Sequence, residues 1–511
     1  MSNKLFKSAA VIGGLTLVSR ILGFIRDIVI ANFFGAGAST DAFFIAFKIP
    51  NFMRRLFAEG AFSQAFTPVL SEYKTKREKT EVKHLVDHVF GSLGGILVIV
   101  TVIGIIAAPL LVMIFAPGFV EDKEKYDLTV AMLQITFPYL LFIALTAFAG
   151  AILNTYGKFA VPAFTPVFLN LTMIGAAVWF APQLENPVMA LAYAVFFAGI
   201  IQLAFQLPFL YRLHLLPRPR YKKKDEGVTR IYKLMLPALF GVSVTQINLL
   251  IDTLMASFLI TGSISWLYYS DRLMEFPLAI FGIALATVML PDLSKSVARG
   301  DNESYNKTLD WALRWVFLIA VPSMLGLVIL AAPILATLFY NGEFGKTDVI
   351  MSARSLIAYA LGLVGFVLIK VLASGFYSRQ DTRTPVKIAV IAMVVNIVLN
   401  LAFIVPLAHA GLALATSLAA LLNATLLYFG LRKLNVFQPR PGWFLFVLRI
   451  LLASLCLTIL LKWGSGNLSD WLTIGTWERA LYLTGWIVAG VIVYFASLAI
   501  FGLRPHHVSM K

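Results

Sequence analysis

Charged side chains gather in three short stretches of an otherwise apolar sequence. The first, SRILGFIRD (residues 19–27), holds Arg20, Arg26 and Asp27. The second, STDAFFIAFKIPNFMRRLFAEGAFSQ (39–64), and the third, YYSDRLMEFP (268–277), carry eight more charges: Asp41, Lys48, Arg54, Arg55, Glu59, Asp271, Arg272 and Glu275. Arginine presents a rigid, permanently charged fork that matches phosphate oxygens. The chemistry that these stretches suggest is therefore the binding of a polyanionic head group.

The elements that must position these charges are membrane-spanning helices. The chain of 511 residues is 59% hydrophobic and only 13% charged, whereas soluble proteins carry roughly 25% charged residues. Apolar runs of about 20 residues, long enough to cross a bilayer, recur from end to end. We predict an all-α polytopic membrane protein of about fourteen helices, near residues 6–31, 41–71, 88–116, 129–153, 162–181, 188–211, 233–260, 265–293, 309–338, 349–377, 387–405, 411–431, 442–464 and 478–502.

The net charge of +16 is not spread evenly, and its distribution argues against nucleic-acid binding. Positive charge fills alternate loops, such as residues 74–83 and 212–230, while the intervening loops APGFVEDKEKYD and NGEFGKTD mix a few lysines with acids. Such alternation is the positive-inside rule. We therefore expect a membrane protein with both termini in the cytoplasm, in contact with membrane lipids and without a nucleic-acid partner.

Cysteine and histidine offer little for redox or metal chemistry. Cys456 is the only cysteine and lies in an apolar run, so no disulfide framework or thiolate site is expected. The six histidines all fall in or beside loops: His84, His88, His214, His409, His506 and His507. No histidine is predicted at membrane depth, and we expect neither a cofactor nor a metal ion.

An internal repeat with a shift of about 222 residues divides the chain. Residues 190–213 align without gaps to 411–434, and Tyr156 and Pro162 correspond to Tyr377 and Pro385. Each repeat holds six spans, an even number, so both repeats share one orientation and are related by an axis along the membrane normal, as in some transporters. The predicted domains are an N-terminal lobe (1–225), a C-terminal lobe (226–436) and two additional helices (437–511).

Ionisable residues at membrane depth cost about 2.5–3.5 kcal/mol each and usually face a cavity or a partner. On an ideal helix, positions 41, 48, 55 and 59 form one polar stripe. Pro50 interrupts that helix, so the wheel does not decide between Arg54 and Arg55. In the alternative interpretation the arginines form structural ion pairs with Asp27, Asp41, Glu59, Asp271 and Glu275. The roles of Lys370 and Asp252 stay open.

The stretch GAGASTDAFFIAFKIPNFMRRLFAEGAFSQAFTPVLSEY, with SRILGFIRD, YYSDRLMEFP and GFYSRQDTRTPVKIA, closely resembles the MurJ (MviN) family. Its members are lipid II flippases of the multidrug/oligosaccharidyl-lipid/polysaccharide exporter superfamily, and the resemblance covers essentially the whole chain. It implies alternating access, a cationic central cavity and a groove for the polyprenyl tail on the last two helices. It assigns head-group binding to Arg20, Arg26, Arg54 and Arg272.

The resemblance and the chemistry together assign roles to the remaining charges. Asp41 and Glu59 are expected to pair with arginines when the cavity is empty. Lys48 lies on the same polar stripe and is expected to take part in gating or ion pairing. Asp27 is expected to help set the gate. Some relatives bind a sodium ion in the second lobe, but no acid constellation here places such a site. The coupling ion, or a role of the membrane potential, therefore stays open.

Three other function classes compete with a lipid II flippase. An enzyme acting on the same lipid needs a positioned base or metal-binding acids, whereas these carboxylates are interleaved with arginines that keep them ionised. An exporter of hydrophobic cations needs acids and aromatics in its cavity instead of arginines. An exporter of another polyprenyl-linked oligosaccharide remains the alternative, because arginine recognises the diphosphate and not the sugar.

Overall fold

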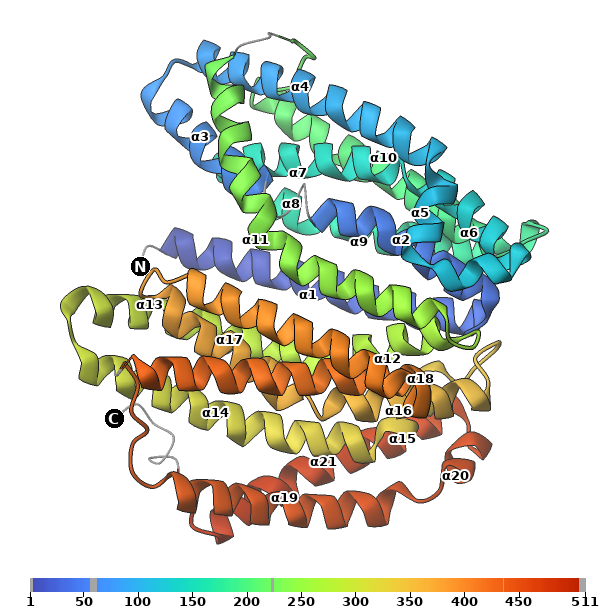
Figure 1. The fold of residues 1–511 in the computed structure, drawn as a ribbon, viewed down its shortest axis with the longest axis vertical. Helices are drawn as coiled ribbons and strands as arrows, with labels where there is room; N and C mark the ends of the chain where they lie inside the picture. Colours follow the sequence, from blue (N-terminus) through green and yellow to red (C-terminus); the bar gives the residue numbers. More distant parts are fainter. Residues whose placement is uncertain (1–2, 56–61, 222–224, 435, 505–511) are drawn as a thin grey trace. The chain divides into compact units, whose positions relative to one another are not determined.

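The computed structural model describes residues 3–55, 62–221, 225–434 and 436–504, and all regular elements in these ranges are helices (Figure 1). The chain forms two compact units, Met1–Gly262 and Ser263–Lys511. The all-α prediction is confirmed. Ten helices of the described residues are long and apolar enough to cross a membrane, and one of these, α18, contains two such runs. The predicted count of fourteen spans is consistent with this.

The first unit contains α1 to α11. Helix α7 packs against α10, α2 against α6, α1 along α8 and α9, and α11 along α3. Gly199 lets α10 approach α7 closely, because a Cβ there would lie 3.0 Å from Tyr139 and Phe142. The bounds are α1 Asn3–Phe34, α2 Ala38–Arg54, α3 Ser63–Lys76, α4 Lys79–Ile106, α5 Ala108–Phe115, η2 Pro117–Glu121, α6 Lys123–Thr136, α7 Tyr139–Thr155, α8 Ala160–Phe164, α9 Pro166–Gly175, η3 Ala176–Phe180, η4 Ala181–Gln183, α10 Met189–Arg212 and α11 Glu226–Ser257.

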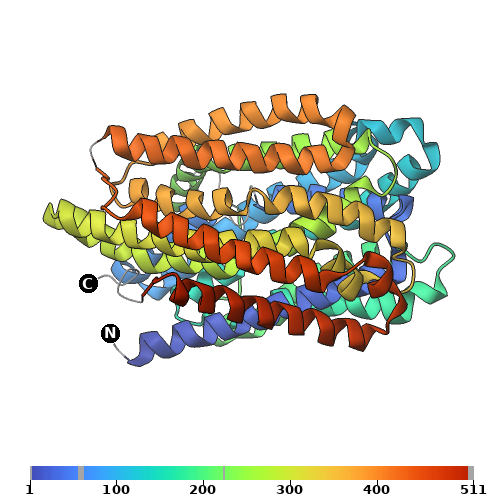
Figure 2. The same ribbon diagram turned by 90° about the horizontal axis from the view of Figure 1, so that it is seen from below.

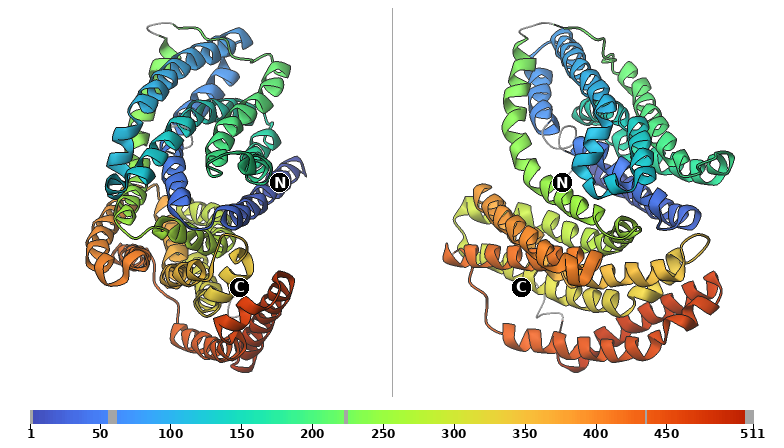
Figure 3. Two further views of the ribbon diagram at one scale, coloured as in Figure 1. Left: turned by 90° about the vertical axis from the view of Figure 1, so that its right-hand side faces the viewer. Right: turned by 45° about the vertical axis from the view of Figure 1, so that its right-hand side comes forward.

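The second unit contains α12 to α21. Helix α17 packs against α18 and α14, and α12 against α16. Helices α19 and α21 lie side by side (Figure 3), and α19 also contacts α14. The bounds are α12 Ser263–Pro277, η5 Leu278–Ile283, α13 Ala284–Arg299, α14 Asn302–Ile329, α15 Ala331–Phe339, α16 Lys346–Ala360, α17 Leu363–Tyr377, α18 Arg383–Lys433, α19 Trp443–Ser465, α20 Leu468–Thr473 and α21 Thr476–Ile500.

Helix α18 is one element by hydrogen bonding but two helices in geometry. Ala408 has non-helical backbone angles (φ 49°, ψ −131°) two residues after Pro406, and the chain turns there between two apolar runs (Figure 2). A Cβ on Gly411 would lie 2.3 Å from the carbonyl oxygen of Phe403, so only glycine fits against the first run. These two runs correspond to the predicted spans 387–405 and 411–431.

The order and lengths of the helices repeat along the chain. Helices α4 and α14 are both 28 residues long and begin at Lys79 and Asn302, 223 positions apart, and α6 and α16 begin at Lys123 and Lys346, again 223 apart. In this register α11 corresponds to α1, yet it packs within the first unit. The predicted lobe boundary at residue 225 therefore follows sequence equivalence, while the compact units follow packing.

Many large apolar side chains remain exposed on these helices. Examples are Ile106, Val405 and Phe444, whose exposed fractions are 74%, 88% and 83%. Soluble monomers rarely expose contiguous apolar surface on this scale. The exposure fits helices whose outer faces contact lipid.

Candidate functional site

Arg26 on α1 is buried in the first unit, with 4% of its surface exposed. Its Nη2 and Nε donate to Asp27 Oδ1 at 2.7 and 3.0 Å, and its Nη1 donates to Asn170 Oδ1 on α9 at 3.1 Å. Asn170 in turn donates to the carbonyl oxygen of Ser19, about two turns before Arg26 on α1. Arg26 thus forms the structural ion pair of the alternative interpretation, with Asp27. Asn170 is a further partner that the sequence did not indicate.

Arg20 lies in a different environment on the same helix. Its side chain is exposed, and the described part of the chain offers it no hydrogen bond or ion pair. Of the two arginines on α1, Arg20 is therefore the one whose guanidinium is accessible without breaking a contact. Within this unit it is the more direct candidate for binding an anion.

Asp41 is buried at the start of α2, with 1% of its surface exposed. Its Oδ2 accepts from Lys125 Nζ at 3.2 Å and from the backbone N–H of Gly262 at 2.7 Å. Lys125 is also buried and lies 4.1 Å from the centre of the Phe119 ring. We expected an arginine partner for Asp41, and the structure adds a lysine from the α6 end of an acidic loop. This network joins α2, α6 and the last residue of the unit.

The remaining predicted charges of α2 are less enclosed. Lys48 and Arg54 are half-buried, and Arg54 Nε donates to Asn51 Oδ1 at 3.1 Å. Arg55 is exposed. Glu59 lies outside the described residues. These contacts, like the sequence, do not decide whether Arg54 or Arg55 faces the predicted cavity.

Arg272, on α12, belongs to the second unit. Its Nη1 donates to Glu275 Oε2 at 3.1 Å, with the two side chains 37% and 47% exposed, and its guanidinium lies 5.6 Å from the centre of the Tyr268 ring. Exposed ion pairs one turn apart contribute little stability. A ligand can therefore replace Glu275 at small cost. Lys370 is exposed on α17, and Asp252 is half-buried on α11.

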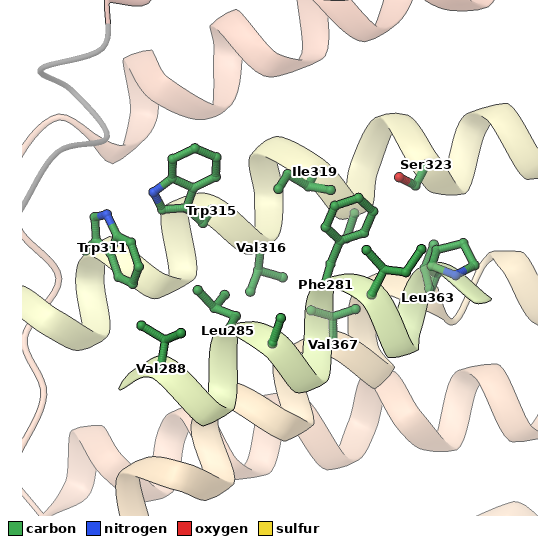
Figure 4. A pocket seen from close by; sticks show the side chains of 14 residues that line it. Phe281, Leu285, Val288, Trp311, Trp315, Val316, Ile319, Ser323, Leu363 and Val367 are labelled. Atoms are coloured by element: carbon green, nitrogen blue, oxygen red, sulfur yellow. The ribbon is translucent and has the colours of Figure 1, made fainter. Parts of the chain in front are cut away.

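An apolar cavity of about 240 Å³ lies within the second unit (Figure 4). Residues of α12, η5, α13, α14 and α17 line it, among them Phe281, Trp311, Trp315 and Val367. Ser323 supplies the one hydroxyl group of this lining. This lining offers no charged group to replace the water around a diphosphate. The cavity is therefore excluded as a head-group site. It also lies on helices other than α19 and α21, where the tail groove was predicted.

Comparisons with known proteins agree on one family. The family model described as "Lipid II flippase MurJ" matches residues 30–479. The chain is 50% identical to a probable lipid II flippase MurJ of Vibrio cholerae, over 99% of this chain and 97% of that one. It is 44% identical to the lipid II flippase MurJ of Burkholderia cenocepacia, over 98% of both.

Solved structures give the same result. A lipid II flippase MurJ in an inward closed conformation matches with a TM-score of 0.80 at 29% identity, over 96% of this chain and 98% of that one. An inward-facing multidrug resistance transporter of the MATE family matches with a TM-score of 0.67 at 15% identity, over 84% of this chain and 98% of that one, which is a likeness of fold alone. Taken together with the matched residues 30–479, these relationships place the chain in the lipid II flippase MurJ family.

Proposed function

We propose that this chain translocates lipid II, the undecaprenyl-diphosphate-linked precursor of peptidoglycan, from the cytoplasmic to the periplasmic leaflet of the bacterial inner membrane by alternating access. The observation that carries the proposal is the 50% identity over 99% of the chain to a probable lipid II flippase. The protein is a transporter and not an enzyme, and its contribution to cell-wall synthesis follows from the cargo.

Arg20, Arg26, Arg54 and Arg272 bind the diphosphate in this proposal. Each guanidinium replaces hydration that the phosphates lose when they enter the membrane. Three of these arginines differ in how accessible their guanidinium groups are. Arg20 is exposed and Arg272 has a partly exposed partner, whereas Arg26 binds cargo only after leaving Asp27. We infer that Arg20 and Arg272 make the first contacts and that Arg26 joins later.

The polyprenyl tail stays in an apolar environment while the head group crosses. Burial of each CH₂ group contributes about 0.8 kcal/mol, so extraction of the whole tail is prohibitive. We propose that α19 and α21 provide the groove for it. The cavity therefore has to open sideways to the bilayer.

Asp41 and Lys48 act in gating or ion pairing in this scheme, together with Asp27 and Glu59. Asp41 supports this role most directly, because it binds both Lys125 and the amide of Gly262, where one compact unit ends. Loss of the Asp41 carboxylate would release both contacts together.

The membrane potential supplies driving force in this scheme. Moving an anionic head group outward from a negative interior gains up to about 2.3 kcal/mol per charge per 100 mV. Collapsing the potential while ion gradients are kept should slow transport in cells. Unchanged rates would instead favour a coupling ion.

Complementation in cells depleted of their own flippase tests the function. The unmodified chain should restore growth and the appearance of lipid II in the outer leaflet, while Arg20→Ala and Arg272→Ala, present in the membrane at normal amounts, should not. Arg→Lys at each position asks whether charge alone suffices. Normal growth of both alanine variants would remove the cationic-cavity mechanism.

The alternative cargo is another polyprenyl-linked oligosaccharide, because diphosphate recognition does not read the sugar. Purified protein in vesicles separates the two. A flippase for lipid II should flip lipid II faster than a matched undecaprenyl-diphosphate oligosaccharide. Equal rates would extend the cargo to the wider class. We further propose a monomer that binds no nucleic acid and has both termini in the cytoplasm.

A further inference from the structure

Three potential metal ligands meet in the first unit, away from the residues discussed above. His84 and His88 stand one turn apart on α4, and Asp225 precedes the first turn of α11. One ligand atom from each residue lies within 4.8 Å of the other two. His88 is buried, Asp225 is half-buried and His84 is exposed, so the cluster is open to solvent on one side.

The contacts around the cluster resemble those of a metal site. His88 Nδ1 lies 3.7 Å from Asp225 Oδ2 and 2.8 Å from the carbonyl oxygen of His84. Histidines that bind metals ordinarily donate their second ring N–H to a carbonyl or a carboxylate. The His84 carbonyl accepts this bond from His88 Nδ1, which leaves Nε2 of His88 as the nitrogen that binds the metal. Asp225 is itself held in place, because its Oδ1 accepts from the backbone N–H of Val228 at 3.0 Å.

We propose that His84, His88 and Asp225 bind a transition-metal dication of the zinc type, with water as the fourth ligand. Two imidazoles and one carboxylate suit zinc. Bond lengths of about 2.0–2.2 Å place tetrahedral ligand atoms roughly 3.3–3.5 Å apart. The ligand atoms lie up to 4.8 Å apart, so the cluster needs to contract by up to about 1.5 Å, to which a rotation of the exposed His84 contributes. This differs from the sequence expectation that the chain binds no metal.

The bound ion would connect two elements that are 137 positions apart, from residue 88 to residue 225. Asp225 caps α11, and α11 contacts α4 nearby through the hydroxyls of Tyr232 and Ser92, 2.9 Å apart. A metal bridge would fix the first turn of α11 to α4. The proposal thus gives this end of α11 a state that depends on metal concentration, independently of the cargo site.

Cobalt titration of the full-length protein tests the proposal. The protein is purified in detergent with a histidine-free tag, stripped with chelator, and carries His506→Gln and His507→Gln in every sample to remove the remaining adjacent pair. Tetrahedral Co²⁺ should produce visible absorption bands at one equivalent, and Zn²⁺ should abolish them. Absence of one-equivalent binding would overturn the proposal.

Three variants and one matched control identify the ligands. His84→Asn changes an exposed side chain, and Asp225→Asn keeps an N-cap residue, so both should fold. Each, like His88→Asn, should weaken Co²⁺ binding by at least about 10-fold. His214→Asn is the control, since His214 has a positive φ of 57° that asparagine tolerates, and it should bind like the parent. Parent-like binding by His84→Asn and Asp225→Asn would refute the assignment.

Hydrogen exchange then separates a bridge from adventitious binding. In the parent, Zn²⁺ should slow exchange in the first turn of α11, residues 226–229. In His84→Asn it should not. Unchanged exchange in the parent at saturating Zn²⁺ would show that the metal does not tie α11 to α4, and would overturn that part of the proposal.

Discussion

Asp87 and Asp310, which lie 223 positions apart, each accept a hydrogen bond from the backbone N–H of an arginine in the linker that follows the last helix of their own repeat, α10 or α18. The distances are 2.8 Å from Arg218 N to Asp87 Oδ1 and 3.2 Å from Arg440 N to Asp310 Oδ1. Both aspartates are 3% exposed and lie in the equivalent helices α4 and α14. The repeat therefore conserves a specific anchor for the chain as well as the order of helices.

Asp310→Asn should lower the stability of the second unit more than a surface change does. Asp310 also binds Arg314 Nε at 2.8 Å and Trp443 Nε1 at 2.6 Å, so the substitution removes the negative charge from an ion pair with Arg314, whose side chain is 12% exposed. Breaking a buried ion pair costs about 3–5 kcal/mol. Thermal unfolding in detergent should show the loss, and the exposed Asp292→Asn should be nearly neutral. Equal melting temperatures would argue against the anchor.

Arg26→Ala and Arg20→Ala should both abolish transport but differ in stability. Removal of Arg26 takes away the guanidinium that lies 2.7 Å from the buried Asp27 carboxylate, whose side chain is 2% exposed, a loss of about 3–5 kcal/mol, whereas Arg20 is exposed and has no ion pair among the described residues. The double variant Arg26→Ala/Asp27→Asn should regain most of the stability and none of the transport. Transport by the double variant would show that Arg26 serves the fold alone.

Lys125→Met should destabilise the first unit, because the buried Asp41 carboxylate then loses the ammonium group that lies 3.2 Å away. Asp41→Asn/Lys125→Met should recover part of the loss, since neither residue is then charged. A double-mutant cycle on unfolding free energy measures the coupling, which should exceed about 1 kcal/mol for two residues in contact. A value near zero would remove this pair from the gate.

Asp301 should make the start of α14 sensitive to acid. Hydrogen bonds from the Ser304 hydroxyl and backbone amide lower the pKa of Asp301 below its ordinary value of 3.8. Because the folded-state pKa is the lower one, this contribution is complete above pH 3.8 and disappears as the pH falls through the folded-state value. Asp301→Ala should therefore be less stable than the parent at pH 7, and the gap should close below pH 3.8. A gap that does not change with pH would contradict the role of the charge.

Cysteine labelling should locate the termini. Cys456 is the only cysteine, so Cys456→Ser provides a background without thiols. In intact cells, a membrane-impermeant maleimide should label Lys123→Cys, in the loop with few positive charges, and should label Arg504→Cys only after the membrane is opened. Labelling of Arg504→Cys in intact cells would reverse the orientation.

Much of the fold was predictable from the sequence, because apolar runs, loop charge and the repeat all report on single helices or on their order. The interruptions of helices within a predicted span were harder to predict. The predicted span 88–116 is divided between α4, which ends at Ile106, and α5, which begins at Ala108, and the span 309–338 is divided between α14, which ends at Ile329, and α15, which begins at Ala331. Such breaks depend on single backbone angles, which leave little trace in a hydropathy pattern.

Two partners of the charged residues in the candidate site could not be predicted from the sequence, Asn170 and Lys125. Asn170 lies 144 positions from Arg26, and Lys125 lies 84 positions from Asp41. No helical wheel connects residues so far apart, because their contact depends on tertiary packing. One signal did exist for Lys125, a basic residue in a loop where the charge pattern predicted few.

The pairing of Arg26 with Asp27 has a consequence for discrimination among anions. The cytoplasm is rich in nucleotides and sugar phosphates that any exposed cluster of arginines attracts. While Arg26 is paired with Asp27, its charge is neutralised and does not attract these metabolites. Arg26 can bind only a ligand that stays near it long enough to replace Asp27. A cargo retained by its lipid tail has that residence time, and a small soluble phosphate does not.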